Sequence, residues 1–558
     1  MSQAETQVEG MDAALVVDPR IDMSEKPKYL IEKGGEYVRY FTEVSQNTST
    51  SAVSFSIVPP SKNIVVDKKM YIDLFCEFTF SGDAGVGNLL MPADPARPTE
   101  LVGETDALRW MPFQSVTESL SLTMNQSTIT QNMSDYIEAL ARCGFSQDYE
   151  THDLSIAPSM HDQFQEYSDN TIYGPARNPL AAYGQNSAQQ PRGAFEYTLV
   201  SNTQTSAVVR VSWSELVMLS PLLFSKIEQK GFLGLTNIDC TWSLGDLSRM
   251  WSHDSVSAAL PTPLSVDSVT FYQPPQMRLC YITPLALAPL PLVNKYPYVN
   301  ISRFPTDLNT INAGATSARL DSQNIQLSSI PKRVIVFARE RNADRSFTRS
   351  DSYARIDTLE VQFDNKNALL GSAKSRDLYE MSVRNGLQMS WMQWSKHCGS
   401  VCVIDFAHDI SLDASQAVGE RGQFQLQMTF TLTNTGSRNI NYTWYIVVLS
   451  EGVFTIANTQ TSLETGVVTP FNVLEAEKYG IESIPWREAY DFQGGSFLGN
   501  IKKWGRRLLP YVRKALPYAK KALQFGEKYL PEAAALLAAG QGVTGGAMAP
   551  RRRLRSRM

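Results

Sequence analysis

One strand-turn-helix passage occurs twice in this 558-residue chain, about 240 residues apart. The first copy reads SVTESLSLTMNQ…SDYIEAL over residues 115–140, and the second reads YARIDTLEVQFDN…RDLYEMSV over residues 353–383. In each copy, apolar residues alternate along a strand, a polar pair suited to a turn follows, and a short amphipathic helix begins about ten residues later. The repeat therefore predicts two similar β domains in tandem.

The repeat has corresponding residues in its strand, turn and helix. A second similarity lies upstream, where each copy is preceded by a basic pair that runs into an apolar strand (VVDKKMYIDLFCEF and SSIPKRVIVFARE). Within the repeat itself, the strand residues Leu120, Leu122 and Met124 correspond to Leu359, Val361 and Phe363. The turn residues Asn125-Gln126 correspond to Asp364-Asn365, and the helix residues Tyr136 and Leu140 correspond to Tyr379 and Val383.

Short alternating runs rich in Val, Thr and aromatic residues continue to about residue 470 and predict an all-β body with short helices. With 43% apolar residues, each half can form its own core. A Pro-rich segment at residues 284–298 separates the halves, and a polar insertion at about residues 147–195 is expected to be a long surface loop. The predicted segments are a flexible arm at 1–30, a first β domain with long surface loops at 31–283, a second at 284–470, a linker at 471–500 and a tail at 501–558.

The cysteine pattern and the N-terminus argue against a secreted protein. The six cysteines form no recognisable disulfide framework, and the first residues lack the apolar core of a signal peptide. No run approaches the roughly 20 apolar residues that a membrane span needs. We therefore expect a chain that is made inside the cell and is not secreted through a signal peptide.

Catalytic and metal-binding patterns are weak. No nucleophile elbow, phosphate-binding loop or dinucleotide fingerprint occurs. The segment HCGSVC (residues 397–402) lacks the spacing of a zinc site and enters an apolar strand, so we expect a core or strand-edge role for it. The segment DFAHD (residues 405–409) is expected to be a polar loop and not a catalytic dyad. We predict no enzyme activity, no metal and no cofactor.

Charge is distributed unevenly. Residues 501–558 contain 14 Lys and Arg but two Glu, a net charge of about +12, whereas the whole chain carries −5, so the remainder carries about −17. Apolar residues in this tail recur at steps of three and four, typical of one helical face, although Pro510 and Pro517 interrupt a continuous helix. A terminus that only aids solubility is the simpler alternative, but it does not need aromatic residues at helical spacing. The pattern favours binding to a polyanion.

Two partners remain open for the tail. Nucleic acid would be bound through its phosphates, without sequence preference and with strong salt dependence. The residues predicted to contact phosphates are Lys502, Lys503, Arg506, Arg507, Arg513, Lys514, Lys520, Lys521, Arg551, Arg552 and Arg553. A membrane is the alternative, disrupted by the apolar face of the tail. The residues predicted for that role are Trp504, Leu508, Tyr511, Tyr518 and Phe525.

The paired segments at residues 69–140 and 333–383, with the closing strands at 424–456, resemble the double jelly-roll major capsid proteins of the hexon-like type. Adenoviruses, virophages, polinton-like viruses and several bacterial viruses have such proteins. The resemblance implies two eight-stranded jelly rolls side by side, at residues 31–283 and 284–470. It also implies homotrimers that form an icosahedral virion inside the host cell together with other capsid subunits and minor capsid proteins. The basic tail departs from the family pattern, and its expected partners are the viral genome or a host membrane.

Two alternatives belong to other classes. A single jelly-roll shell protein with a protruding β domain, from a small RNA or DNA virus, would also have a basic arm, but its two halves would differ. A β-sandwich carbohydrate-binding or hydrolytic protein would be expected to have a secretion signal or clustered carboxylates, and the sequence has neither.

Overall fold

The computed structural model describes residues 37–469 with gaps at 91–105, 145–157, 159–160, 168–194, 218–230, 256–259, 285–289, 291, 414–415 and 467, plus residue 473 and three N-terminal strands. These strands are β1 (Thr6–Gln7), β2 (Ala13–Val17) and β3 (Lys28–Glu32), paired antiparallel. The sequence analysis expected a flexible arm at residues 1–30 and did not predict these strands. The run AALVV has the β-branched and apolar composition that favours a strand, and the sequence prediction gave it too little weight.

The first half of the chain contains an antiparallel sheet with the central order β4-β18-β8-β13. Along β8, buried residues alternate with half-buried ones over ten positions, so one face of the strand lies in a core. The strands of this sheet are β4 (Tyr37–Val44), β7 (Val65–Val66), β8 (Tyr71–Asp83), β12 (Glu196–Asn202), β13 (Ser206–Leu216), β14 (Phe232–Leu233), β17 (Thr262–Phe271) and β18 (Gln276–Thr283).

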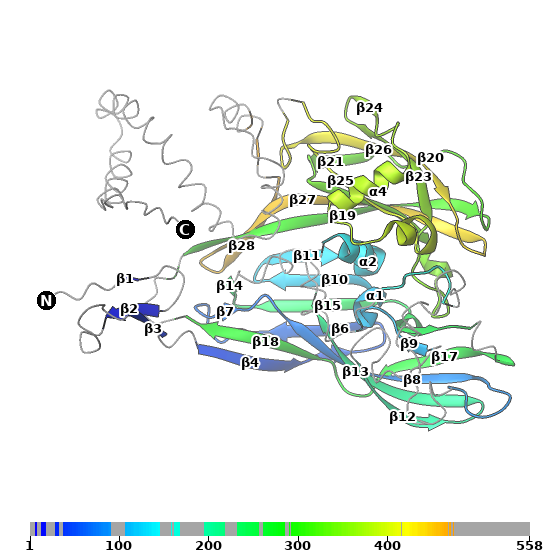
Figure 1. Cartoon of the computed structure of the whole chain (residues 1–558). Coiled ribbons are helices and arrows are strands. Elements are labelled where there is room, and N and C mark those ends of the chain that lie inside the picture. Colours follow the sequence, from blue (N-terminus) through cyan, green and yellow to red (C-terminus); the bar gives the residue numbers. More distant parts are fainter. Residues whose placement is uncertain are drawn as a thin grey trace, which may run out of the picture. The chain divides into compact units, whose positions relative to one another are not determined.

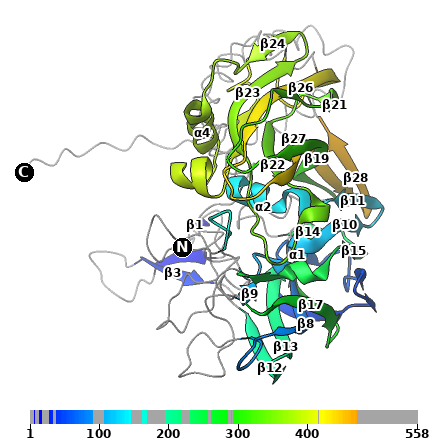
Figure 2. The same ribbon diagram turned by 90° about the vertical axis from the view of Figure 1, so that its right-hand side faces the viewer.

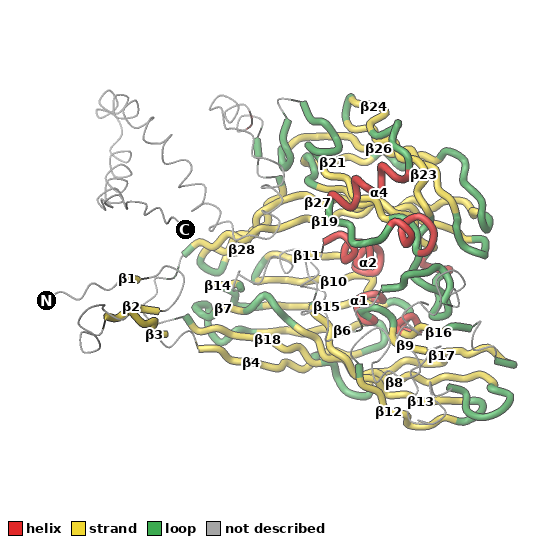
Figure 3. The backbone as a smooth tube through the Cα atoms, viewed as in Figure 1, coloured by secondary structure: helices red, strands yellow, loops and turns green. Residues whose placement is uncertain are grey.

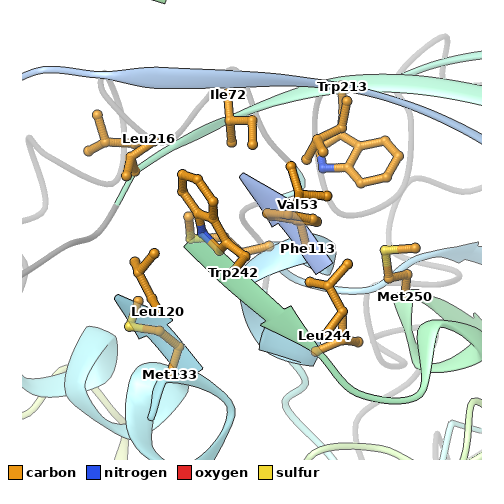
Figure 4. Close-up of a cluster of buried hydrophobic side chains, with 14 of the residues drawn as sticks. Val53, Ile72, Phe113, Leu120, Met133, Trp213, Leu216, Trp242, Leu244 and Met250 are labelled. Atoms are coloured by element: carbon orange, nitrogen blue, oxygen red, sulfur yellow. The ribbon is translucent and has the colours of Figure 1, made fainter. Parts of the chain in front are cut away.

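A second sheet, with the order β5-β6-β15-β10-β11, packs against the first. Figure 4 shows the core between them, where Trp242 and Val53 of this sheet lie near Ile72 and Trp213 of the other. The elements are β5 (Asn47–Thr48), β6 (Ala52–Ile57), β10 (Thr117–Met124), β11 (Ser127–Gln131) and β15 (Ile238–Leu244), with the small pair β9 (Asp106–Leu108) and β16 (Trp251–His253), and the helices α1 (Pro112–Val116), α2 (Met133–Gly144) and η3 (Leu247–Met250).

The second half has two sheets of its own, with the orders β19-β27-β22-β25 and β21-β26-β23-β24. Between them lies a second core, in which Trp444 of one sheet stacks on Phe430 of the other with ring centroids 3.8 Å apart. The elements are β19 (Val293–Ile311), β20 (Leu320–Asp321), β21 (Ile325–Ser329), β22 (Arg333–Glu340), η4 (Asn342–Asp344), β23 (Arg355–Phe363), β24 (Lys366–Leu369), α4 (Ser375–Arg384), η5 (Gln393–His397), β25 (Val401–Asp405), β26 (Arg421–Thr433), β27 (Ile440–Ala457) and β28 (Gln460–Thr465).

The two halves have the same topology. Eight strands of the first half (β4, β6, β8, β10, β11, β13, β15 and β18) correspond in order to β19, β21, β22, β23, β24, β25, β26 and β27 of the second. Numbered 1 to 8 within its half, each set forms one sheet in the order 1-8-3-6 and another in the order 2-7-4-5. This is the jelly-roll arrangement, so the prediction of two tandem jelly rolls is confirmed. The alternative of one jelly roll with a different protruding domain is wrong.

The repeated passage also has the predicted local structure. Strands β10 and β23 each end in a turn whose first residue has a left-handed backbone, with a φ of 52° at Asn125 and 51° at Asp364. Asn and Asp tolerate this conformation better than most residues. A short strand and then a helix follow in both copies: β11 and α2, β24 and α4. Figure 3 shows how short these helices are beside the strands.

Helix α1 of the first jelly roll depends on a buried carboxylate from another strand. Glu215 of β13 is fully buried and accepts hydrogen bonds from the backbone N–H groups of Phe113 at 2.8 Å and Gln114 at 3.1 Å. The indole N–H of Trp213 donates a third, at 2.6 Å. Burial raises the pKa of Glu215 from 4.5 to about 7, although these three hydrogen bonds act in the opposite direction.

The titration of Glu215 gives a testable pH dependence. Between about pH 4.5 and 7 the folded protein keeps a proton that the unfolded chain releases, so this group makes stability fall as pH rises through that window. The variant Glu215→Gln has no charge to bury and is expected to lose this fall in stability with pH. Thermal unfolding of both proteins at about pH 5 and pH 8 measures it. A gap in Tm between the two proteins that stays the same at both pH values would contradict the prediction.

Candidate assembly interface between the two jelly rolls

A single carboxylate of the second jelly roll meets three arginines in the interface between the halves. Asp351, in the connection between β22 and β23, lies 2.7 Å from Arg109 Nη1, 3.1 Å from Arg249 Nη2 and 2.5 Å from Arg339 Nη2. Arg109 and Arg249 belong to the first jelly roll, and Arg339 lies on β22 of the second. All four side chains are buried. Burial would raise the pKa of Asp351, but the surrounding guanidinium groups hold it well below its ordinary value.

Helix α2 brings a second carboxylate to the same cluster. Glu138 lies 2.8 Å from Arg142 on its own helix and 3.7 Å from Arg339 of the second jelly roll. Burial acts to raise the pKa of Glu138, yet Arg142, Arg339 and the His161 imidazole, whose Nδ1 lies 3.7 Å away, lower it to about 2, so it is ionised at neutral pH. Burial and the nearby Arg142 lower the pKa of His161 to about 4, so the imidazole is neutral there.

The apolar residues of α2 belong to both cores. Met133, Ile137 and Ala141 pack in the core of the first jelly roll, whereas Tyr136, Ala139, Leu140 and Cys143 pack in the core of the second. Figures 1 and 2 both show α2 between the strands of the two halves. An amphipathic helix normally has one apolar face and one polar face, but α2 buries two adjoining faces in two domains and so joins them.

Further contacts hold the same interface at its ends. Asp135 of α2 lies 2.7 Å from Arg303 Nε of β19, and the Asn342 side chain donates to it at 3.1 Å. At the other end, the Asn125 side chain in the β10–β11 turn donates to the carbonyl of Thr459 at 2.7 Å. The Thr461 hydroxyl donates to the carbonyl of Met124 at 3.0 Å. Both jelly rolls belong to one compact unit.

Part of the polar insertion also lies in this interface. We expected residues 147–195 to form a surface loop, but within residues 161–167 Asp162, Phe164 and Gln165 are buried. Asp162 accepts a hydrogen bond from the backbone N–H of Asp351 at 2.7 Å, and Gln165 donates to the Thr435 hydroxyl at 2.7 Å. The expectation is wrong for these residues because the Asp162 carboxylate and the Gln165 amide nitrogen find partners in the second jelly roll, which lowers the cost of burying them.

A buried ionic cluster of this kind fixes an arrangement more than it adds stability. Taking charges out of water is costly, and hydrophobic replacements of buried ion pairs are often neutral or stabilising. The geometry of the cluster, however, is satisfied in one relative position of the two jelly rolls, in which Asp351 meets arginines from both. We therefore expect the interface to hold the two jelly rolls in this one arrangement, as a single building unit.

The other residues considered from the sequence have these positions in the structure. Cys398 and Cys402 are buried, and the ring of His397 packs on Phe164, in accordance with the predicted core role. Asp405 pairs with Arg333 at 2.8 Å, and Asp409 accepts from the backbone N–H of Asp405, so DFAHD is tied into the second jelly roll. Within the residues that the structure describes, no group of three or more potential ligands is arranged to hold a metal.

The predicted tail residues lie outside the described residues. This holds both for the cations from Lys502 to Arg553 and for the apolar residues from Trp504 to Phe525. In the described part of the chain, no helix combines the length and the apolar composition needed to cross a bilayer.

Comparison with known proteins identifies the family. The model for the first domain of the Sputnik virophage major capsid protein matches residues 10–277, and the model for the C-terminal domain of the major capsid protein V20 matches residues 302–398 and 393–452. The chain is a double jelly-roll major capsid protein, similar in both domains to those of virophages. Its two jelly rolls thus match the two domains that these family models describe.

Individual relatives agree with this result. The putative capsid protein V20 of Sputnik virophage is 27% identical over 524 residues, which cover 88% of this chain and 86% of that protein. A chain in the cryo-EM structure of the Sputnik virophage superposes with a TM-score of 0.74 at 27% identity, covering 85% of this chain and 97% of that one. The crystal structure of the mavirus major capsid protein has the same fold, with a TM-score of 0.64 at 14% identity, covering 84% and 99%.

As a double jelly-roll major capsid protein, the chain is a structural component of the virion and not an enzyme. The carbohydrate-binding or hydrolytic alternative is therefore wrong. No motif in the sequence indicated the ionic interface. Arg109 and Asp351 are 242 positions apart, and the acidic and basic residues of the cluster are individually unremarkable surface types in the sequence.

Proposed function

We propose that this capsid protein forms homotrimers that act as the capsomers of an icosahedral virion. The observation that supports the proposal is the interface above, because two jelly rolls locked by buried charges and by a shared helix behave as one rigid unit. A rigid subunit with two similar domains suits closed cyclic assembly, in which each copy presents the same pair of surfaces. Its partners would be other copies of the chain, other capsid subunits and minor capsid proteins, inside the host cell.

The mass of the assembly in solution tests whether the chain forms trimers. Native mass spectrometry and light scattering of the full chain at micromolar concentration are expected to show three copies per particle. A protein that remains monomeric under these conditions would contradict the proposal.

We further propose that the tail, residues 501–558, contacts the packaged genome. The support is the charge mismatch: the rest of the chain carries about −17 and would repel a polyanion, whereas the tail carries about +12. The boundaries proposed from the sequence remain 31–283 and 284–470 for the jelly rolls, 471–500 for the linker and 501–558 for the tail. Disruption of a host membrane during entry is the competing role.

Nucleic-acid binding of the full chain tests the genome role. If the tail makes six to ten phosphate contacts, affinity for double- or single-stranded nucleic acid is expected to fall about 10³-fold or more between about 50 and 200 mM salt. Changing the eleven predicted phosphate-contacting cations to Gln is expected to abolish that binding, measured by fluorescence anisotropy. Changing Trp504, Tyr511, Tyr518 and Phe525 to Ser is the matched variant, since it keeps the charge.

The two roles predict opposite results for these variants. Under the genome role, the Gln variant loses packaging, whereas the Ser variant still binds nucleic acid. If the Gln variant packages its genome normally and the Ser variant loses both liposome leakage and infectivity, the genome role is wrong and the tail acts on membranes.

A further inference from the structure

Four guanidinium groups lie near the Asp351 carboxylate in the interface between the jelly rolls, but it pairs with three of them. Arg109, Arg249 and Arg339 form the ion pairs described above. Arg345, in the connection between β22 and β23, is close enough to lower the pKa of Asp351 but forms no ion pair with any described residue. Arg345 is buried, with 8% of its surface exposed. The interface therefore contains a buried cation without a carboxylate partner among the described residues.

The two carboxylates nearest in effect to Arg345 are engaged by other groups. Asp351 and Asp135 both act to raise its pKa, so both lie in its neighbourhood. Asp351 holds the three arginines named above. Asp135 lies 2.7 Å from Arg303 Nε and accepts a hydrogen bond from the Asn342 side chain at 3.1 Å. Neither carboxylate is left to pair with Arg345.

Three of these arginines have buried donor groups without an acceptor. The Nε group of Arg345 donates to the backbone carbonyl of Glu340 at 2.8 Å, but its Nη1 and Nη2 groups have no acceptor among the described residues. The Nε groups of Arg249 and Arg339 also have none. A buried donor without an acceptor is costly, and in native proteins such groups are normally satisfied by protein, by ordered water or by an ion.

The charge of the cluster favours an anion over water as the acceptor for these donors. Burial, and then the neighbouring Arg339, lower the pKa of Arg345 to about 10. Burial lowers the pKa of Arg249 to about 9, and the neighbouring cations add to this effect although Asp351 opposes it. Water can accept hydrogen bonds but cannot balance charge, whereas an anion does both and favours the protonated guanidinium groups.

Guanidinium groups also select the class of anion. Their planar fork of N–H groups matches two oxygens of a phosphate-type or sulfate-type ion. The cluster lies close to the protein surface, because Arg345 follows directly after η4, in which Asn342 and Ala343 are exposed. A small shift of this surface turn would let an ion from solvent reach the buried donors.

We propose that Arg249, Arg339 and Arg345 bind a small tetrahedral oxyanion, such as inorganic phosphate, between the two jelly rolls. Arg249 belongs to the first jelly roll and the other two arginines to the second, so the anion is a third component of the interface. It accepts from the donors that the protein leaves without a partner and balances the charge that Asp351 does not. Because the folded interface binds the ion and the unfolded chain does not, stability rises with the concentration of the ion.

Thermal unfolding of the full chain in phosphate tests the proposal. At pH 7 and constant ionic strength, Tm is expected to rise as phosphate replaces chloride between about 0.1 and 20 mM. Arg345→Gln is expected to need about tenfold more phosphate, or more, for the same rise. Arg345→Lys keeps the charge but loses the fork, and is expected to give an intermediate result. Arg376→Gln is the matched control, since the Arg376 side chain is 79% exposed, and it is expected to respond as wild type does.

The comparison between variants removes effects that do not depend on this site. Phosphate stabilises folded proteins in general by exclusion from their surface, and it can bind the basic tail, but both effects are the same in wild type and in Arg345→Gln. The same phosphate dependence in wild type and both Arg345 variants would overturn the proposal. So would a Tm that does not change when phosphate replaces chloride, since the ions would then act only by screening.

A direct measurement on the wild type keeps the test decisive if the Arg345 variants do not fold. Equilibrium dialysis with radiolabelled phosphate is expected to show one saturable phosphate per chain that is retained in about 200 mM sodium chloride, whereas phosphate on an exposed basic segment is displaced by salt. A wild-type chain without a saturable phosphate under these conditions would overturn the proposal.

Discussion

Replacing Asp351 by Ala is expected to lower the free energy of unfolding by about 3–5 kcal/mol, among the largest effects of any single change in this chain. The reason is not the loss of one favourable ion pair. Without this carboxylate, Arg109, Arg249 and Arg339 remain buried with less negative charge to balance them, and Arg249 has no other ion pair among the described residues. The protein must then either leave cations unpaired in its interior or let water into the interface.

Chemical denaturation of wild type and Asp351→Ala, followed by tryptophan fluorescence, measures the effect. The matched control is Glu464→Ala, which removes an exposed ion pair with Arg421 and is expected to change stability by less than about 0.5 kcal/mol. Hydrogen exchange adds a local readout, because faster exchange in α2 of the Asp351 variant would report separation of the two jelly rolls. Equal stabilities of the Asp351 variant and the control would show that the cluster does not hold the interface.

The sequence contained enough information for the fold because the signals for it are local. Alternation along residues 117–124 and 355–363, a turn residue that tolerates a left-handed backbone, and a short amphipathic helix are each specified within a few residues. Their recurrence at a distance of about 240 residues then indicated two copies of one domain. The pairing order of the strands was not visible, since it depends on which distant segments meet.

The interface could not be predicted for the same physical reason. Asp351 gains its role from arginines that are 242, 102 and 12 positions away, and no window of sequence contains the set. The polar insertion illustrates the converse error. Asp162 and Gln165 belong to a segment with the composition of a surface loop, yet they are buried where the Asp162 carboxylate and the Gln165 amide nitrogen meet partners from the other jelly roll. A polar segment is therefore predicted to be exposed unless its hydrogen-bond partners in the fold are known.

The core of the second jelly roll gives the other large effect. Trp444 of β27 is fully buried and stacks on Phe430 of β26, so its side chain joins the two sheets. Trp444→Ala is expected to cost about 3–5 kcal/mol, from lost apolar contact and from the cavity that remains. Trp444→Phe is expected to cost much less. The indole N–H has no acceptor among the described residues, so this change also removes a buried unsatisfied donor.

The same variant shows whether the two jelly rolls unfold together. If the buried charges and α2 couple them, Trp444→Ala in the second core is expected to move the whole denaturation curve to lower denaturant and keep a single transition. Trp242→Ala, in the core of the first jelly roll, is then also expected to shift the whole denaturation curve and keep a single transition. The reason is that unfolding of either jelly roll would uncover the buried charges of the other. Two separate transitions, with Trp444→Ala moving one and Trp242→Ala the other, would mean that the jelly rolls are independent. The rigid unit on which the proposed capsomer depends would then have to be created by assembly itself.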